Sequence, residues 1–353
     1  MTAQVRGGPP LGLLDFLANL GGRMPQSASP NYRLGSLYST VTAFLYATQE
    51  PFSFLAAKRL NTMQFVCLTQ IALLISIPLV TTPAKSRRDF FVLLGNPLNY
   101  WKLAAIFAIG MSGLLLYNFG LSNAHPIIIS AILNLTPFWG AAVALILLRI
   151  PIPVSPTVFF GCFAGAFLGA MAVAWSQIGD ANKPAINELA ENIVHGSWVY
   201  AIPVPLCSVL GGTLIGKWLA RYDESAAVAS NFLFANVLLI PTTLFILYQR
   251  SELEFDNQFT AIVLMILGTI IAASIGRVFY QIALTATGGD NGFVTMFFNL
   301  VPALTALISL ILSWWIADLH FAIDPMFFLG LALIVVSLVI FSLKSWRQPV
   351  RPA

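Results

Sequence analysis

The side chains best suited to bind a small molecule lie inside long apolar stretches of this sequence. In one stretch, Tyr46, Gln49 and Glu50 are spaced at i, i+3 and i+4, which places them on one face of a helix. The Glu50 carboxylate could bind a cationic group or a proton. Alternatively, Glu50 lies near the end of the stretch and pairs with Lys58 or Arg59.

A second group repeats this spacing near the C-terminal end of the chain. Arg277, Tyr280 and Gln281 also share one helix face. The guanidinium could hold a carboxylate or a phosphate through two parallel hydrogen bonds. Alternatively, its long apolar stem lets the charge reach the cytoplasmic headgroups. We do not expect an ion pair between Glu50 and Arg277, because their helix positions separate them by about 14 Å.

Two asparagines, Asn134 and Asn299, each lie three residues before a proline. They could bind a substrate, or they could satisfy backbone carbonyls freed by Pro137 and Pro302. We favour the structural role, and we expect helix kinks at Pro51, Pro137 and Pro302. Four further residues are candidates for the wall of a cavity, although plain packing is the better explanation for the aromatic ones: Tyr117, Asn118, Trp139 and Tyr200.

The composition shows which elements must hold these residues. Of 353 residues, 58% are hydrophobic and 9% are charged, whereas soluble proteins carry about a quarter charged residues. The mean hydropathy is +0.82, so lipid must replace water around much of the chain. We predict an all-α integral membrane protein with ten transmembrane helices. Their predicted ranges are 34–57, 62–81, 101–120, 126–148, 154–175, 195–219, 226–248, 258–284, 289–315 and 323–343.

The basic residues are distributed unevenly over the segments between these stretches. With the N-terminus in the cytoplasm, 13 of the 18 lysines and arginines fall on the cytoplasmic side and four on the outer side. This bias predicts that both termini are cytoplasmic. Because the basic residues lie at the ends of apolar stretches, the net charge of +4 does not indicate nucleic-acid binding.

The two halves of the chain resemble each other. Ser130 to Pro137 reads SAILNLTP, and Thr295 to Pro302 reads TMFFNLVP, 165 residues later. Upstream, YNFGLS at Tyr117 matches YQIALT at Tyr280. Several collinear matches at nearly constant offset indicate an internal repeat. Because each half contains five stretches, an odd number, the second half must enter the membrane from the opposite side. Such inverted repeats are typical of secondary transporters.

These features together resemble the drug/metabolite transporter (DMT) superfamily, and its EamA-like permeases in particular. The resemblance rests on the five-plus-five plan, the basic loop after the second stretch, and the paired NLTPFWGAAVAL and NLVPALTALISL segments. It implies a secondary transporter of small metabolites, with export the expected direction, and a central cavity lined by both halves. The alternatives are an exchanger of phosphorylated or nucleotide-linked metabolites and, from another class, a membrane-embedded lipid-modifying enzyme.

The predicted organisation follows from the stretches. A cytoplasmic tail, 1–33, precedes a first EamA-like repeat, 34–175; an external loop, 176–194, leads to a second repeat, 195–343, and a tail, 344–353. The sequence contains no GxxxxGK[ST], HExxH or GxSxG motif, so we expect no cofactor, no metal and no enzymatic activity.

The expected partners are a small-molecule substrate and the lipid bilayer, with protons as a candidate coupling ion. Nucleic acid is not expected. The small residues Gly161, Ala164, Gly165 and Gly169 favour close helix packing within the chain over a dimer interface, so we expect a monomer or a weak homodimer. The expected location is a bacterial inner (plasma) membrane.

Overall fold

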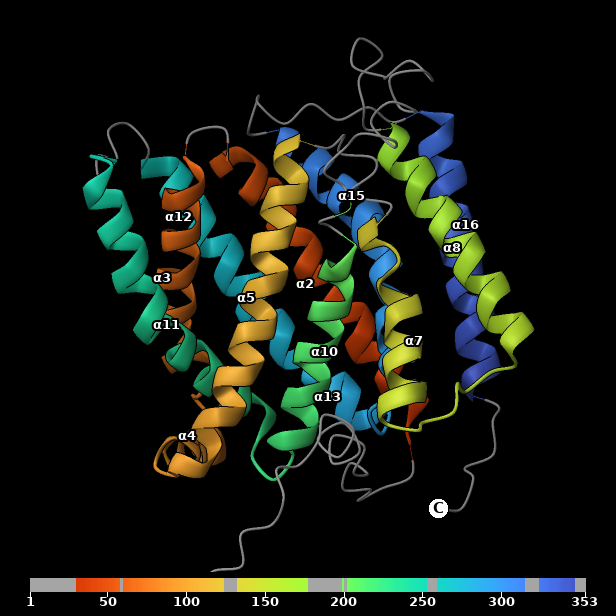
Figure 1. Cartoon of the computed structure of the whole chain (residues 1–353). Coiled ribbons are helices and arrows are strands. Elements are labelled where there is room, and N and C mark those ends of the chain that lie inside the picture. Colours follow the sequence, from red (N-terminus) through yellow and green to blue (C-terminus); the bar gives the residue numbers. More distant parts are fainter. Residues whose placement is uncertain are drawn as a thin grey trace, which may run out of the picture.

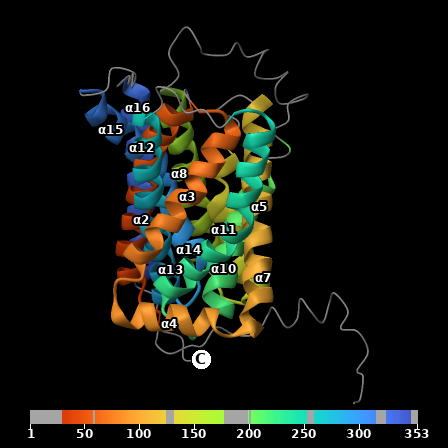
Figure 2. The same ribbon diagram turned by 90° about the vertical axis from the view of Figure 1, so that its left-hand side faces the viewer.

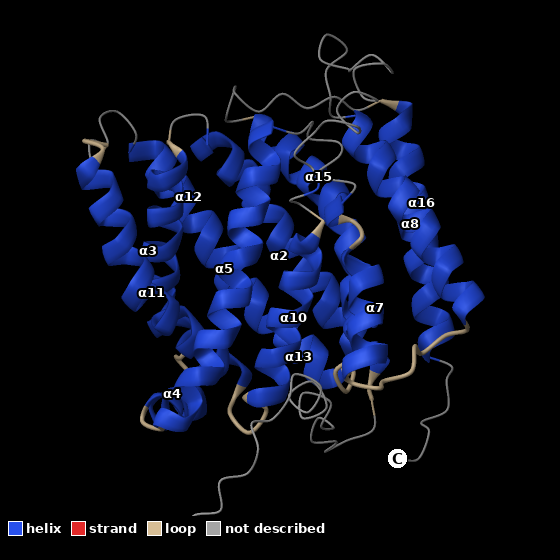
Figure 3. Ribbon diagram, in the orientation of Figure 1, coloured by secondary structure: helices blue, strands red, loops and turns tan. Residues whose placement is uncertain are grey.

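The computed structural model describes residues 30–57, 60–123, 132–176, 199, 202–252, 259–314 and 324–346. Helices make up this part of the chain, and no strand occurs in it (Figure 3). The all-α prediction is therefore confirmed for these residues. The elements are α2 (Tyr32–Ala57), α3 (Thr62–Val80), α4 (Ala84–Leu94), η1 (Pro97–Asn99), α5 (Tyr100–Asn123), α7 (Thr136–Leu147), α8 (Pro156–Ser176), α10 (Pro203–Trp218), α11 (Glu224–Gln249), α12 (Phe259–Thr269), η4 (Ile270–Gly276), α13 (Arg277–Ala286), α14 (Asn291–Met296), η5 (Phe297–Leu300), α15 (Val301–Ser313) and α16 (Pro325–Trp346).

The long helices run side by side as a bundle (Figure 1). Within the described residues, six helical segments are long and apolar enough to cross a membrane. Large apolar side chains also remain exposed on the outside of the bundle, for example Phe328 at 59% and Val336 at 56%. The chain is therefore a multi-pass membrane protein. The six segments are Met63–Val80, Pro156–Ser176, Glu224–Gln249, Ile262–Ala286, Asn291–Ser313 and Pro325–Trp346.

Helix α4 was not expected from the sequence, which reads there as a basic loop. It lies across one end of the bundle (Figure 2). Phe90 and Leu93 are buried against the bundle, whereas Phe91 and Val92 are exposed at 66% and 53%. An amphipathic helix in this position is typical of the membrane interface.

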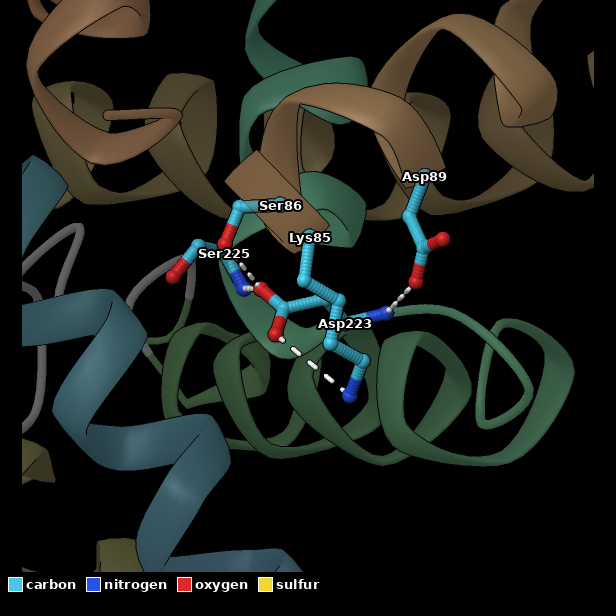
Figure 4. Close-up of polar contacts among 5 residues, drawn as sticks. All are labelled: Lys85, Ser86, Asp89, Asp223 and Ser225. Carbon is cyan, nitrogen blue, oxygen red and sulfur yellow. Dashed lines mark hydrogen bonds and ion pairs between the residues drawn. The ribbon is translucent and has the colours of Figure 1, made fainter. Parts of the chain in front are cut away.

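Figure 4 shows how α4 is fastened to the connection between α10 and α11. The Asp223 carboxylate caps α11 by accepting from the Ser225 N–H at 3.1 Å, and it also accepts from Ser86 Oγ at 2.7 Å. Asp89 Oδ2 accepts from the Asp223 N–H at 2.9 Å. The Lys85 Nζ to Asp223 Oδ2 ion pair is 3.8 Å long and solvent-exposed on the lysine side, so it adds little to stability. The hydrogen bonds therefore hold α4 in place.

Three long helical segments change from one helix type to another or are interrupted by a turn. Helix α12 continues into the π-helix η4, and α13 then begins at Arg277. The 3₁₀-helix η5 separates α14 from α15, and a turn at Asn134 and Leu135 precedes α7. Pro137 and Pro302 both occupy the first turn of the helix that follows the break, where a missing N–H costs nothing. Pro51, in contrast, lies inside the continuous helix α2.

Candidate functional site

The candidate site lies where α2, α10 and α13 meet. Among the described residues of this site, Arg277 is the charged one. Arg277 is the first residue of α13, directly after the seven-residue π-helix. Short π-helical segments are rare and occur frequently at functional sites. Counted along Phe259–Ala286, Arg277 lies about 7 Å from the midpoint of this helical run. The π-helix therefore positions a guanidinium well inside the bundle.

The Arg277 side chain is partly buried, and its surroundings are aromatic and glycine-rich. A side chain at Gly211 of α10 would meet Arg277 Nη2 at 3.9 Å, so the guanidinium faces this glycine. Gly276 contacts the Tyr46 ring, which brings α2 to the same level. Gly211 and the Tyr46 ring thus lie next to the start of α13.

Arg277 has no carboxylate and no hydrogen-bond partner among the side chains that the structure describes. The acidic groups described lie in α4, at helix ends or in connections: Asp89, Asp223, Glu224, Glu252, Asp290 and Asp324. A guanidinium without a counter-ion inside an apolar bundle is costly. Among the described side chains, none supplies this counter-ion.

Phe298 of η5 joins the two tyrosines into an aromatic wall. Its ring lies 5.4 Å from that of Tyr46 in an edge-on arrangement and 5.7 Å from that of Tyr280. The sequence groups containing Tyr46 and Arg277 are therefore brought together in space, as they would have to be to form one site. Gln49, on α2, is partly buried.

A polar junction lies next to this wall, centred on the fully buried Asn291. Tyr280 Oη donates to Asn291 Oδ1 at 2.6 Å. The Asn291 amide donates in turn to Thr213 Oγ1 at 2.7 Å and to the Val209 carbonyl at 3.2 Å. A side chain at Gly140 would lie only 2.8 Å from the Asn291 carbonyl oxygen. Helices α7, α10, α13 and α14 thus meet at one asparagine.

Gln281 belongs to this junction rather than to an open cavity. It is 1% exposed, and its Nε2 donates to the Gly212 carbonyl at 3.2 Å. Gly212 must remain a glycine here, because any Cβ would lie 2.9 Å from Tyr280 Oη and closer still to its ring. Tyr280 and Gln281 therefore hold α13 in close contact with α10.

The paired asparagines lie at equivalent breaks, just before α7 and α15. Asn134 is 7% exposed and lies in the turn before α7. Asn299 is fully buried in η5, and its Nδ2 donates to the Met296 carbonyl at 3.1 Å. Its Oδ1 has no hydrogen-bond partner within the described residues. Asn299 thus bonds to a backbone carbonyl near its own break, although not to that of Phe298, four residues before Pro302.

The remaining predicted site residues are distributed as follows. Trp139 of α7 is partly buried and packs edge-on against Phe138 at 5.7 Å. Tyr200 lies outside the described residues, as do the side chains of Glu50, Tyr117 and Asn118, although the helices that carry these three are described.

The sequence analysis missed Asn291 and Thr213, which form the centre of the polar junction. Asn291 follows Gly-Gly-Asp at the start of the predicted span 289–315, where no polar contact was expected. The available signal was Asp290, an N-cap residue directly before an apolar run. In the structure, Asp290 Oδ1 accepts from the Phe293 N–H at 2.9 Å and starts α14 at Asn291.

Asp290 also ties this connection to the start of α2. Tyr32 Oη donates to Asp290 Oδ2 at 3.4 Å, and the Asn31 N–H donates to the Ala286 carbonyl at 2.8 Å. Asp290 lies between the apolar segments Ile262–Ala286 and Asn291–Ser313 and is 2% exposed. Desolvation raises the pKa of this carboxyl from 3.8 to about 7, although hydrogen bonds from Phe293, Tyr32 and Gly292 oppose the rise.

Comparisons with known proteins bear on the fold alone. No protein-family profile and no curated protein matches this sequence. Among solved structures, one described only as "Crystal structure of protein" superimposes with a TM-score of 0.61 at 19% sequence identity. The similarity covers 89% of this chain and 98% of that chain. The helical arrangement is therefore shared along almost the full length of another protein.

Proposed function

We propose that this chain is a secondary transporter of small anionic metabolites that works by alternating access. The observation that carries the proposal is Arg277. Its guanidinium lies inside the bundle, faces Gly211 and has no acidic partner among the described side chains. A carboxylate or phosphate of a substrate would supply the missing charge through a bidentate contact. The aromatic wall of Tyr46, Phe298 and Tyr280 would cover the apolar part of the same substrate.

The pairing of helices supports two related halves of five spans each. In this proposal the first half is α2, α3, α5, α7 and α8, and the second is α10, α11, α12–α13, α14–α15 and α16. Exchanging the halves converts the contact of α2 with α13 into that of α10 with α5, and the contact of α2 with α15 into that of α10 with α7. The pairs α3–α11, α7–α14 and α8–α16 are converted into themselves. Such an arrangement is expected of an inverted repeat.

The two Asn-Leu-x-Pro segments support the same repeat. In both, the asparagine lies in a non-α-helical break, and the proline follows in the first turn of the next helix. Interrupted helices near the membrane centre are typical of transporter binding sites. We therefore retain the ten-span plan, cytoplasmic termini and membership of the EamA-like DMT permeases as parts of this proposal.

The position of Arg277 between the halves suits alternating access. Tyr46 comes from the first half, whereas Gly211, Arg277 and Tyr280 come from the second. Rocking of one half against the other would change the side from which the guanidinium is reached, without refolding either half. Because one guanidinium dominates this site, a small carboxylate or phosphate ester suits it better than a nucleotide-linked substrate.

Uptake by protein reconstituted in liposomes tests this function. We expect saturable uptake of a subset of radiolabelled small carboxylates and phosphate esters, with counter-flow when the lumen is preloaded with the same compound. A channel would instead give flux without saturation or counter-flow. Arg277→Gln should weaken substrate affinity about 10- to 100-fold, as expected for a charge-assisted hydrogen bond. Arg88→Gln, on the exposed face of α4, is the matched control and should leave uptake unchanged. Unchanged affinity in Arg277→Gln would remove the binding role.

Proton coupling is a separate part of the proposal and depends on Glu50. Uptake should then increase with an imposed pH gradient in the wild-type protein and lose that dependence in Glu50→Gln. If Glu50→Gln abolishes uptake but wild-type uptake ignores the gradient, Glu50 serves the cavity without carrying protons.

A further inference from the structure

A groove lies on the outer surface of the bundle between α2 and α16, away from the Arg277 site. Its volume is about 490 Å³. One wall is the first part of α2, the other is the last half of α16, and η5 forms the floor. The residues that matter for the argument are Arg33, Leu37, Leu300, Val335, Val339 and Trp346. We call this feature the α2–α16 groove.

The length of the groove along α16 matches the thickness of one leaflet of a bilayer. Its lining on α16 runs from Val335 to Trp346, which is about 16 Å of helix. The hydrocarbon core of a membrane is about 30 Å thick, so one leaflet contributes about half of that. Trp346 and Arg33 lie at the end where α2 begins and α16 finishes. The groove therefore extends from one membrane surface towards the bilayer centre.

Two hydroxyl groups in the groove wall, those of Ser36 and Thr40, do not need a ligand. Thr40 Oγ1 donates to the Ser36 carbonyl at 2.8 Å, and Ser36 Oγ donates to the Tyr32 carbonyl at 2.8 Å. Both groups are thus satisfied by their own helix. Most of the remaining surface is apolar and includes aliphatic side chains such as Leu37, exposed at 58%, and Val339, exposed at 50%. This wall suits a hydrocarbon chain.

The mouth of the groove has a fixed aromatic ring and a free positive charge. Trp346 Nε1 donates to Ser36 Oγ at 3.1 Å, which ties the C-terminal end of α16 to α2. The Arg33 guanidinium lies 5.9 Å from the centre of the Trp346 ring. Arg33 is exposed, and no carboxylate pairs with it among the described residues. Tryptophan is enriched at the headgroup level of membranes, and basic pockets between helices bind lipid headgroups.

We propose that the α2–α16 groove is a binding site for one anionic glycerophospholipid. One acyl chain lies along Val335 and Val339, and the headgroup phosphate meets Arg33 beside Trp346. The Arg33 charge beside Trp346, at the end of the groove where the helices reach the membrane surface, favours an anionic lipid over a helix of a second copy. The proposal does not depend on transport.

Native mass spectrometry of the delipidated full-length protein tests the site. The protein is titrated with phosphatidylglycerol or with phosphatidylcholine of identical chains. We expect one tight phosphatidylglycerol adduct, with phosphatidylcholine about fivefold weaker, as expected for one basic side chain at a membrane surface. Arg33→Gln should remove this preference. Lys344→Gln is the matched control, because it removes a charge from the same end of α16 outside the groove lining.

A second pair of variants tests the acyl-chain part of the groove. Val339→Trp should fill the groove and abolish the tight adduct. Val336→Trp is the control: Val336 is similarly exposed, at 56%, but does not line the groove. Thermal unfolding of each variant checks that it folds. Equal retention of both lipids by all variants would mean ordinary surrounding lipid and would overturn the proposal. A protein dimer that Val339→Trp dissociates would also overturn it, because a second copy would then occupy the groove.

Discussion

Two helix interfaces of this protein are packed closely through glycines, and hydrogen bonds between side chains of the described residues fasten one of them as well. At the polar junction, Gly140 and Gly292 allow α7 to contact α14, and Asn291 links the neighbouring α10 and α13. At the outer pair, α8 and α16 touch at Gly169 and Gly330 through backbone atoms. Packing is the main force between helices in lipid, and hydrogen bonds there contribute modestly. The polar groups therefore fix the relative orientation of the helices at the junction, whereas the outer pair is held by close packing.

Because of this difference, we expect the helices at the junction to move relative to one another more readily than α8 and α16. The junction joins helices of both proposed halves next to Arg277, and hydrogen bonds of Asn291 connect α14 with α10 and α13. The α8–α16 pair lies at the edge of the bundle (Figure 1), where the two helices are in close backbone contact. We expect the three perturbations below to distinguish the two regions.

The largest expected effect is a pH dependence confined to the junction. The folded protein keeps a proton on Asp290 up to about pH 7, whereas the unfolded chain releases it near pH 3.8. Between these values the folded state binds more protons, so stability falls as pH rises and is lowest above pH 7. The full difference is about 4 kcal/mol in the free energy of unfolding. It is measured as the melting temperature in detergent between pH 4 and pH 8.

Asp290→Asn should flatten this dependence, because asparagine still caps α14 but does not titrate. Asp324→Asn is the matched control at the outer pair. Asp324 caps α16 in the same way, with its Oδ1 accepting from the Phe327 N–H at 2.8 Å. We expect Asp324→Asn to keep the wild-type slope. If both variants keep it, Asp290 is not the group that titrates.

The second prediction concerns the outer pair. In Gly169→Ala the new methyl group would lie 2.6 Å from the Gly330 carbonyl oxygen and 3.0 Å from the Ile334 nitrogen. Because both are backbone atoms, the helices must separate, and we expect a loss of about 2 kcal/mol. Gly161→Ala, also in α8, meets nothing within 4 Å and should gain up to about 1 kcal/mol from helix propensity. Melting temperatures that shift equally in both variants would contradict the close contact.

Hydropathy could predict the long apolar helices but not helix α4 or the π-helix η4. Six predicted spans agree with the observed apolar segments to within a few residues, for example 323–343 with Pro325–Trp346. Helix α4 was missed, because eleven residues containing Arg87 and Arg88 lack a membrane-spanning signal. The π-helix before Arg277 was missed because its residues, IIAASIG, are equally compatible with an α-helix.

From the sequence, only those site residues that share a helix face could be grouped together. Spacing grouped Tyr46 with its neighbours on α2, and Arg277 with Tyr280, and the structure brings the two groups together through Phe298. Spacing could not show that Tyr280 and Gln281 are committed to Asn291 and to the Gly212 carbonyl, because these partners are distant in sequence. Long-range contacts of this kind are set by which helices become neighbours.

The smallest expected effect tests whether hydrogen bonds add to glycine packing at the junction. Asn291→Ala removes the partner of Tyr280 Oη, Thr213 Oγ1 and the Val209 carbonyl. Hydrogen bonds between membrane helices contribute about 0.6 kcal/mol on average, so we expect a loss of about 1–2 kcal/mol. A double-mutant cycle with Thr213→Val isolates one bond, and the coupling energy should be about 0.5–1 kcal/mol. Zero coupling would mean that packing alone holds both interfaces. A weak but measurable coupling would instead fit a junction that orients α10 and α13 around Arg277 and can still be broken when the helices move.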